Sequence, residues 1–309
     1  MRMKRLVVLL CAAVIVAGIP VSAGANVTPL SALVSVEEVL YGEVQAGSLL
    51  ERIERVENDI YGKPQEGAVL LRIDRVQSFL ESTEGKEGSL KLQLNLAEWG
   101  FMASLTDGQP LIGRLEQMES ELYGTPQSGP IADRVRDLMM MVWGTTNLDV
   151  KSVTLPAQSL VKVVLTTPVD SGKSKEGDAV KYRVVEDVMV DGRVVIPAGA
   201  EGQGRVAEVH SAGRLGKDGR IVIDFGRIPS LDGTMVKLRV DQRATEENKS
   251  MELAAGASMA GVLLLGPVGL VGGYFVKGKD VKIDTKTEFY VETERSMPVS
   301  GFFFRPAPL

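Results

Sequence analysis

The chain has 309 residues, of which 44% are hydrophobic and 24% charged, with a formal net charge of −5 and one cysteine. This length and apolar content suffice for a buried core, and the acidic balance argues against nucleic acid as a general partner. A single cysteine, Cys11, excludes an internal disulfide framework and a thiolate metal site.

The first residues have the pattern of a signal peptide. Three basic residues precede an apolar run over residues 6–19, and Ala23 and Ala25 each follow as a small cleavage-site residue. An uncleaved membrane anchor is the alternative, although the run is shorter than the roughly 20 residues of a membrane span. We therefore expect residues 1–25 to be removed on export to the periplasm or cell envelope, which leaves 32 Lys and Arg against 40 Asp and Glu.

Residues 26–150 contain an internal repeat. Tyr41-Gly42 and Tyr61-Gly62 are 20 residues apart, and so are Tyr123-Gly124 and Trp143-Gly144. Five or six units fit this period, and residues 91–110 hold only a degraded one. A fixed period of this size predicts equivalent structural units that stack on one another.

Each unit is predicted to be one amphipathic helix. Ile53, Val56 and Ile60 follow the spacing of one helix face, and Glu and Arg occupy the other positions. Gly62 suits a left-handed C-terminal cap, and Pro64 prevents the helix from continuing. A helix of about 12 residues is marginal alone, so we expect the units to pair as antiparallel helical hairpins.

The aromatic residue at the end of each unit is a candidate contact residue. These residues are Tyr41, Tyr61, Tyr123 and Trp143. The simpler interpretation is that they brace the turn against the next helix, and the alternative is a ligand platform. Helical repeats typically bind a protein or a polymer without chemistry, so an envelope protein or a cell-wall polymer is the expected partner.

Residues 151–299 are predicted to form a β-barrel or sandwich. Short segments alternate between apolar and polar residues, which is typical of half-buried strands. The clearest are residues 180–184, 221–225 and 236–240. Asp191-Gly192 and Asp232-Gly233 suit tight hairpin turns, so the strands are expected to pair antiparallel and to close on themselves.

The order of motifs in this half resembles a known family. The motifs are Leu155-Pro156-Ala157, residues 165–169, 184–188, 195–199 and 221–225, and Asp232-Gly233-Thr234. Over about 150 residues this order is similar to the C-terminal barrel of the TrbI-type scaffold of conjugative type IV secretion systems. The resemblance implies an envelope scaffold whose apolar insertion reaches the outer membrane. The family carries a non-cleaved inner-membrane anchor and a proline-rich linker, where this chain has a predicted leader and helical repeats.

A glycine-rich apolar insertion is predicted over residues 251–278. The 24 residues from Leu253 to Val276 carry no charge, and Pro267 divides them into two pieces too short to span a bilayer. We expect a helical hairpin that dips into a membrane or lines a homo-oligomer; a hairpin folded back on the barrel and a straight transmembrane helix are the alternatives. The candidate contact residues are Leu253, Gly256, Gly261, Leu264, Gly266, Pro267, Gly269, Gly273 and Phe275.

No motif specifies an enzyme, a cofactor or a metal site. His210 is the only histidine, and the loop of residues 213–220 resembles a phosphate-binding loop only in composition. Residues 292–294 are predicted to be a solvated strand end. The aromatic tail of residues 300–309 is expected to pack locally or against a partner.

The sequence therefore predicts an α+β protein with two domains, helical-hairpin repeats followed by an antiparallel β-barrel or sandwich with its insertion. The favoured function is a non-enzymatic envelope scaffold. One alternative is a wall module that binds peptidoglycan or another glycan through Tyr61, Tyr123 and Trp143. The other alternative is a hydrolase that uses carboxylates such as Glu208 and Asp224.

Overall fold

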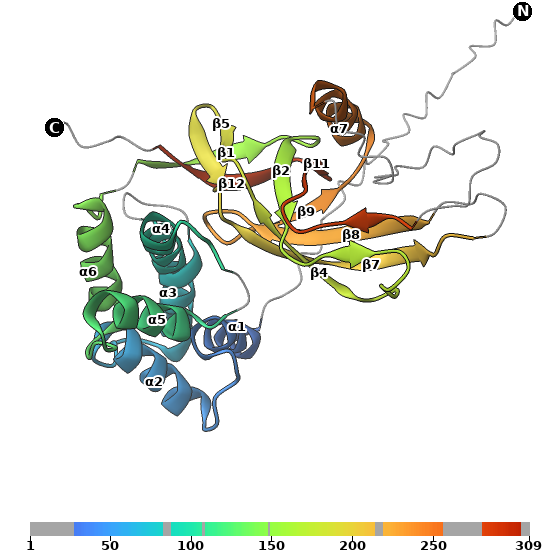
Figure 1. The fold of residues 1–309 in the computed structure, drawn as a ribbon. Helices are drawn as coiled ribbons and strands as arrows, with labels where there is room; N and C mark the ends of the chain where they lie inside the picture. Colours follow the sequence, from blue (N-terminus) through green and yellow to red (C-terminus); the bar gives the residue numbers. More distant parts are fainter. Residues whose placement is uncertain are drawn as a thin grey trace, which may run out of the picture.

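The computed structural model describes residues 28–82, 88–106, 109–147, 149–213, 219–255 and 280–303. Six helices come first along this part of the chain, and strands with one further helix follow. Figure 1 shows the first six helices gathered beside the β-structure, with α7 apart from them. The predicted α+β layout, a helical front half and an antiparallel β back half, is confirmed.

The first six helices all have 13 residues: α1 Pro29–Tyr41, α2 Leu49–Tyr61, α3 Val69–Glu81, α4 Leu90–Met102, α5 Leu111–Tyr123 and α6 Ile131–Trp143. In α2 the predicted apolar stripe of Ile53, Val56 and Ile60 is fully buried. Ser48 and Glu51 form a capping box at the start of α2, and Gly62 ends it with a φ of 79°. Local sequence signals thus set both ends of this helix.

The six helices pack on neighbours that are two and four helices away, as well as on adjacent ones. α1 contacts α3 and α5, while α2 contacts α6 and α4 contacts α6. The end of α1 meets the start of α5 closely, since a Cβ on Gly42 would lie 2.6 Å from Cγ of Pro110. The end of α2 meets the start of α6 in the same way, at Gly62 and Pro130. Helix i therefore covers the first turn of helix i+4.

Six strands form a closed barrel in the order β11-β2-β4-β7-β8-β9. Their bounds are β2 Leu160–Leu165, β4 Ala179–Val184, β7 Glu201–His210, β8 Arg220–Pro229, β9 Met235–Arg239 and β11 Glu288–Thr293. The rings of Tyr182, Phe225 and Phe289 pack in series inside, with centroids 5.4 Å apart for each neighbouring pair. The predicted closure of the strands is confirmed, and it leaves the barrel without an unpaired sheet edge along its circumference.

A second sheet has the order β1-β12-β6-β5, and β3 Val169–Asp170 pairs with β10 Lys282–Ile283. The strands of this sheet are β1 Val150–Leu155, β5 Val188–Val190, β6 Arg193–Ile196 and β12 Met297–Phe302. Because β12 pairs with β1 as far as Phe302, residues 300–302 belong to this strand and not to the predicted tail. Residues 304–309 lie outside the described part of the chain.

The helical half packs on the β half through α4. Leu90, Leu92, Leu94 and Leu96 are all buried, so this helix has apolar residues on more than one face. Asn95 donates a hydrogen bond of 2.7 Å to the carbonyl oxygen of Leu231 in the β half. The degraded repeat unit therefore corresponds to α4, which lies between the other helices and the strands. Because α4 is covered on several sides, it lacks the polar face of an amphipathic helix.

Aromatic rings close the same interface. Phe302 of β12 lies against Trp143 and Trp99, with ring centroids 5.4 and 6.4 Å away. Trp143 also donates from Nε1 to the carbonyl oxygen of Leu96, at 3.0 Å. The end of β12 is thus part of the helical core.

Candidate functional site

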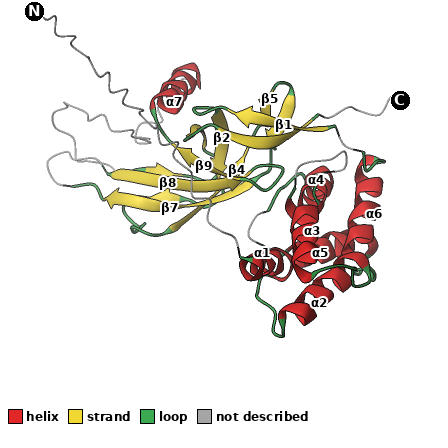
Figure 2. Ribbon diagram, turned by 180° about the vertical axis from the view of Figure 1, so that it is seen from behind, coloured by secondary structure: helices red, strands yellow, loops and turns green. Residues whose placement is uncertain are grey.

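The candidate site is the root of the apolar insertion, where α7, Gln242–Ala255, leaves the barrel. Leu253 lies in the last turn of α7. The remaining predicted contact residues, from Gly256 to Phe275, lie outside the described residues, as do the other residues of 256–279. Figures 1 and 2 both show α7 on the opposite side of the β-structure from α1–α6. The structure therefore describes how α7, which leads into this segment, is attached to the barrel on the side away from the helical half.

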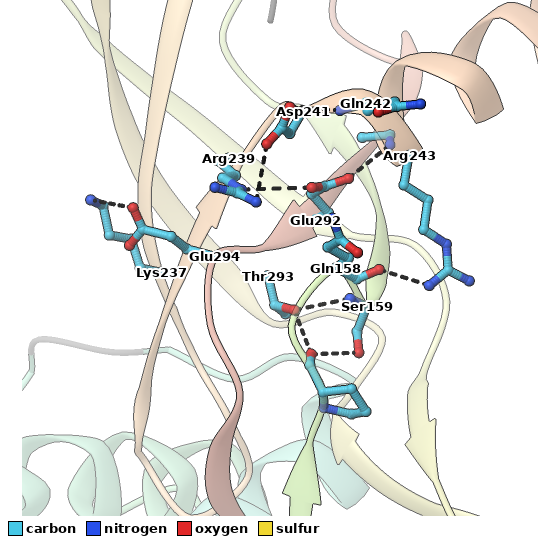
Figure 3. A network of polar contacts seen from close by, with 12 residues as sticks. Gln158, Ser159, Lys237, Arg239, Asp241, Gln242, Arg243, Glu292, Thr293 and Glu294 are labelled. Carbon is cyan, nitrogen blue, oxygen red and sulfur yellow. Dashed lines mark hydrogen bonds and ion pairs between the residues drawn. The ribbon is translucent and has the colours of Figure 1, made fainter.

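A buried carboxylate holds the start of α7. Glu292 of β11 is 0% exposed, and its Oε2 accepts a hydrogen bond of 2.9 Å from the backbone N–H of Ala244. Its other oxygen lies 3.6 Å from Nε of Arg239 (Figure 3). A negative charge at a helix N-terminus is favourable because the first N–H groups there lack partners within the helix. Glu292 thus ties the first turn of α7 to the barrel wall.

A side-chain amide fixes the second turn of α7. Asn248 donates from Nδ2 to the carbonyl oxygen of Tyr290, at 2.9 Å, and accepts from the N–H of Tyr290 at 2.6 Å. This pair of bonds occupies the backbone of β11 beside its short pairing with β9, which involves only Glu292 and Thr293. Arg243 adds a bond of 2.9 Å to the carbonyl oxygen of Gln158. Three side chains on two elements therefore set the direction in which α7 leaves the barrel.

Residues 292–294 were predicted to be a solvated strand end, and this prediction is wrong for two of them. Glu292 and Thr293 are both 0% exposed. Strand alternation puts Glu292 on the outer face of β11, opposite to Val291, but α7 covers that face. No local signal in the sequence indicates this cover, because the helix lies about 45 residues earlier in the chain.

The helical half contains a recurring buried ion pair. A Glu near the end of one helix pairs with an Arg near the start of the next: Glu37 with Arg52, Glu57 with Arg72, Glu98 with Arg114, and Glu119 with Arg134. In the second pair Nη2 of Arg72 lies 2.6 Å from Oε2 of Glu57, and neither side chain is more than 7% exposed. Hydrogen bonding to these carboxylates raises the pKa of Arg52, Arg72 and Arg134.

Each of these carboxylates also holds the loop that follows its helix. Glu57 accepts from the backbone N–H of Gln65 at 2.8 Å, and Glu119 accepts from that of Gln127 at 2.9 Å. The amphipathic pattern of each helix predicts solvent-facing positions for Glu and Arg, which is wrong for these residues. The signal that identifies them is a Glu-to-Arg spacing that recurs with the helices, 15 residues in three pairs and 16 between Glu98 and Arg114.

Three of the four predicted repeat contact residues brace neighbouring elements. Tyr41 donates to Oδ2 of Asp59 in α2 at 2.7 Å, and the ring of Tyr61 lies 5.3 Å from that of Phe79 in α3. Trp143 contacts α4 and β12 as described above. Tyr123 is 39% exposed. These contacts favour the bracing interpretation over a ligand platform for Tyr41, Tyr61 and Trp143.

The residues considered for chemistry lie on the outside of the barrel. His210 is exposed, and its Nε2 lies 2.9 Å from Oε1 of Glu208. Asp224 pairs instead with Arg205, at 3.3 Å. Within the described ranges there is no group of three His, Cys, Asp or Glu side chains arranged to hold a metal ion. The second oxygen of Glu208 lies 3.8 Å from Nη2 of Arg220, so Glu208 and Asp224 each face a different arginine.

Among the helices that the structure describes, none combines the length and the apolar character that crossing a membrane requires. The predicted leader, residues 1–25, and most of the insertion fall outside that description.

No protein-family model matches the chain, and no curated protein matches it. Among solved structures, ComB10 of the Com type IV secretion system of Helicobacter pylori matches at 15% identity and a TM-score of 0.27, over 50% of this chain and 92% of that one.

Proposed function

We propose that the protein is a non-enzymatic scaffold of the cell envelope that presents its apolar insertion, residues 251–278, to a membrane or to an oligomer. The observation that carries the proposal is the attachment of α7. Glu292, Asn248 and Arg243 join this helix to the barrel at three points, immediately before 24 residues without a charge. A segment of that composition has to be received by something apolar.

The position of α7 supports separate roles for the two halves. α7 leaves the barrel on the side opposite to α1–α6, so a membrane or oligomer contacted by the insertion leaves the helical half accessible (Figure 2). The helical half has the architecture of a protein-binding array, in which a short helix and its loop recur. We assign it the binding of a partner protein in the envelope.

The test is fractionation of the native envelope with and without residues 253–276. Release of the deleted protein into the soluble fraction is the expected result. A matched variant, Asn248→Ala, loosens the root of the insertion without removing an apolar residue, and it should remain in the membrane fraction. If the intact and the deleted protein are equally soluble and also have the same mass in sedimentation velocity, the insertion contacts neither a membrane nor an oligomer and the proposal fails.

A further inference from the structure

The helical half exposes apolar side chains at one repeated position. Position 2 of the first three helices is Leu30, Leu50 and Leu70, and these leucines are 53%, 45% and 57% exposed. Position 2 of α5 and α6 is Ile112 and Ala132, and both are partly buried in the helical core. The same position is therefore open at the front of the array and covered at the back of it.

The contact between helix i and helix i+4 explains this difference. The starts of α5 and α6 are covered by the ends of α1 and α2, where Gly42 meets Pro110 and Gly62 meets Pro130. Within the described chain, no helix stands four places before α1, α2 or α3, so their first turns lack the equivalent cover. We define the front surface as Leu30, Leu50 and Leu70.

The last two helices of the array, α5 and α6, have an uncovered surface at their C-terminal ends. A Cβ added to the cap glycines of α5 and α6, Gly124 and Gly144, would meet nothing within 4 Å. In α1 the residues at positions 10 and 11, Glu38 and Val39, line a cleft together with the start of α5.

In α6 those two positions are Met140 and Met141, which are 50% and 59% exposed. We define the back surface as Met140, Met141 and Gly144. Methionine side chains adapt readily to an apolar partner of irregular shape.

We propose that the front surface of one copy docks on the back surface of a second copy, head to tail. Within one chain, the ends of α1 and α2 pack on the starts of α5 and α6. The proposed contact would be of the same kind, but between two chains. Both surfaces are apolar, and both lie at helix ends that other helices of the same repeat cover elsewhere in the chain. The front surface of one copy is therefore the partner that we propose for the back surface of another. This inference deepens the scaffold proposal and rests on it, because it names a partner for the helical half.

Such a contact is heterologous, since two different surfaces meet, and it therefore builds rings or filaments. This geometry provides the test. Copies blocked at the front cannot associate with one another, and neither can copies blocked at the back. A mixture of the two still has one functional front and one functional back, and it forms a dimer of one copy of each.

The experiment uses the full mature chain in a mild detergent and measures its mass by sedimentation velocity. The front variant carries Leu50→Glu with Leu70→Glu, and the back variant carries Met140→Glu with Met141→Glu. The control is Met189→Glu, because Met189 is 55% exposed on β5, away from both surfaces. Circular dichroism establishes that each variant is folded.

The expected result is an oligomer for the wild type and the control, a monomer for each variant alone, and a dimer in the mixture. A monomeric wild type, unaffected variants, or a mixture that stays monomeric would each overturn the proposal. If glutamate prevents folding, Leu70→Cys in one chain and Met140→Cys in another provide a disulfide cross-link test, because Cys11 in the predicted leader is the only native cysteine. All of these variants keep the insertion intact. A negative result here would therefore overturn the head-to-tail contact without testing whether the insertion docks at a membrane.

Discussion

The helical half and the barrel half place buried charge in different ways. The helical half buries a Glu–Arg pair between consecutive helices four times. Among the residues that the structure describes in the barrel half, the one buried carboxylate is that of Glu292, which accepts from a helix N-terminus and whose Oε1 lies 3.6 Å from Nε of Arg239. A short helix and its loop have few contacts of their own, so each helical unit needs a connection to the next. The barrel closes through strand pairing and uses its buried charge for one attachment only.

The largest effect is expected from breaking one pair of the helical half. Glu57→Ala leaves the guanidinium of Arg72 buried without its partner and removes the acceptor of the Gln65 N–H. Losing one member of a buried pair costs about 3–5 kcal/mol of unfolding free energy. Chemical denaturation measures this loss of unfolding free energy. The control is Glu66→Ala, at an exposed loop position, which should change the unfolding free energy by less than about 0.5 kcal/mol. Equal effects of the two substitutions would contradict the structural role of the pair.

The cap glycines separate backbone strain from packing. Gly42 and Gly124 have φ values of 79° and 83°, so alanine at either position costs about 1–2 kcal/mol in backbone strain. Only Gly42→Ala also collides with Pro110, which adds about 1–3 kcal/mol. Thermal unfolding of the two variants should therefore show a lower midpoint for Gly42→Ala. A lower midpoint for Gly124→Ala would mean that the end of α1 does not cover the start of α5.

The barrel should respond locally to loss of its buried carboxylate. Glu292→Ala leaves the first turn of α7 without its acceptor, at a cost of about 1–3 kcal/mol. Hydrogen exchange should become faster in residues 242–250 and stay unchanged in α1–α6. Glu288→Ala is the matched control, since this carboxylate lies on the same strand and its side chain is 45% exposed. Faster exchange throughout the chain would show that the attachment also supports the barrel.

The smallest effect concerns a tyrosine in the helical half. Burial, and then the nearby charge of Glu57, raise the pKa of Tyr61 from 10.0 to about 12. The neutral phenol is thus favoured in the folded state, and its contribution to stability is complete below pH 10.0 and lost as the pH rises through about 12. The alkaline absorbance titration of the wild type minus that of Tyr61→Phe isolates this group. A midpoint at the ordinary value would mean that the phenol is not buried against α3.

Local signals predicted the helices and strands, while contacts distant in sequence escaped prediction. The stripe of Ile53, Val56 and Ile60 and the cap at Gly62 depend on residues within one helix, so periodicity was sufficient. The pairing of Glu57 with Arg72 was missed because helical periodicity assigns charged residues to solvent. The burial of Glu292 depends on α7, and nothing in the neighbouring sequence indicates that cover.

The candidate site was predicted only in its location. The composition of residues 251–278 indicated an apolar insertion, but the manner of its attachment did not follow from that composition. The side-chain amide of Asn248 bonds the backbone N–H and carbonyl oxygen of Tyr290, as a neighbouring strand would. No sequence pattern indicates this role. The degraded repeat in residues 91–110 was recognised as irregular. Its cause, the burial of α4 between helices and strands, required the structure.

The position of Phe302 sets an order of events during synthesis. Its ring packs against Trp99 and Trp143, and Phe302 pairs in register with Val150, 152 positions earlier. The six helices precede this residue in the chain, so any helical array that forms before β12 is available has its tryptophan contacts incomplete. The two halves can join fully only once residue 302 is present. Chains truncated before β12 are therefore expected to carry a formed helical array that is not locked to the barrel.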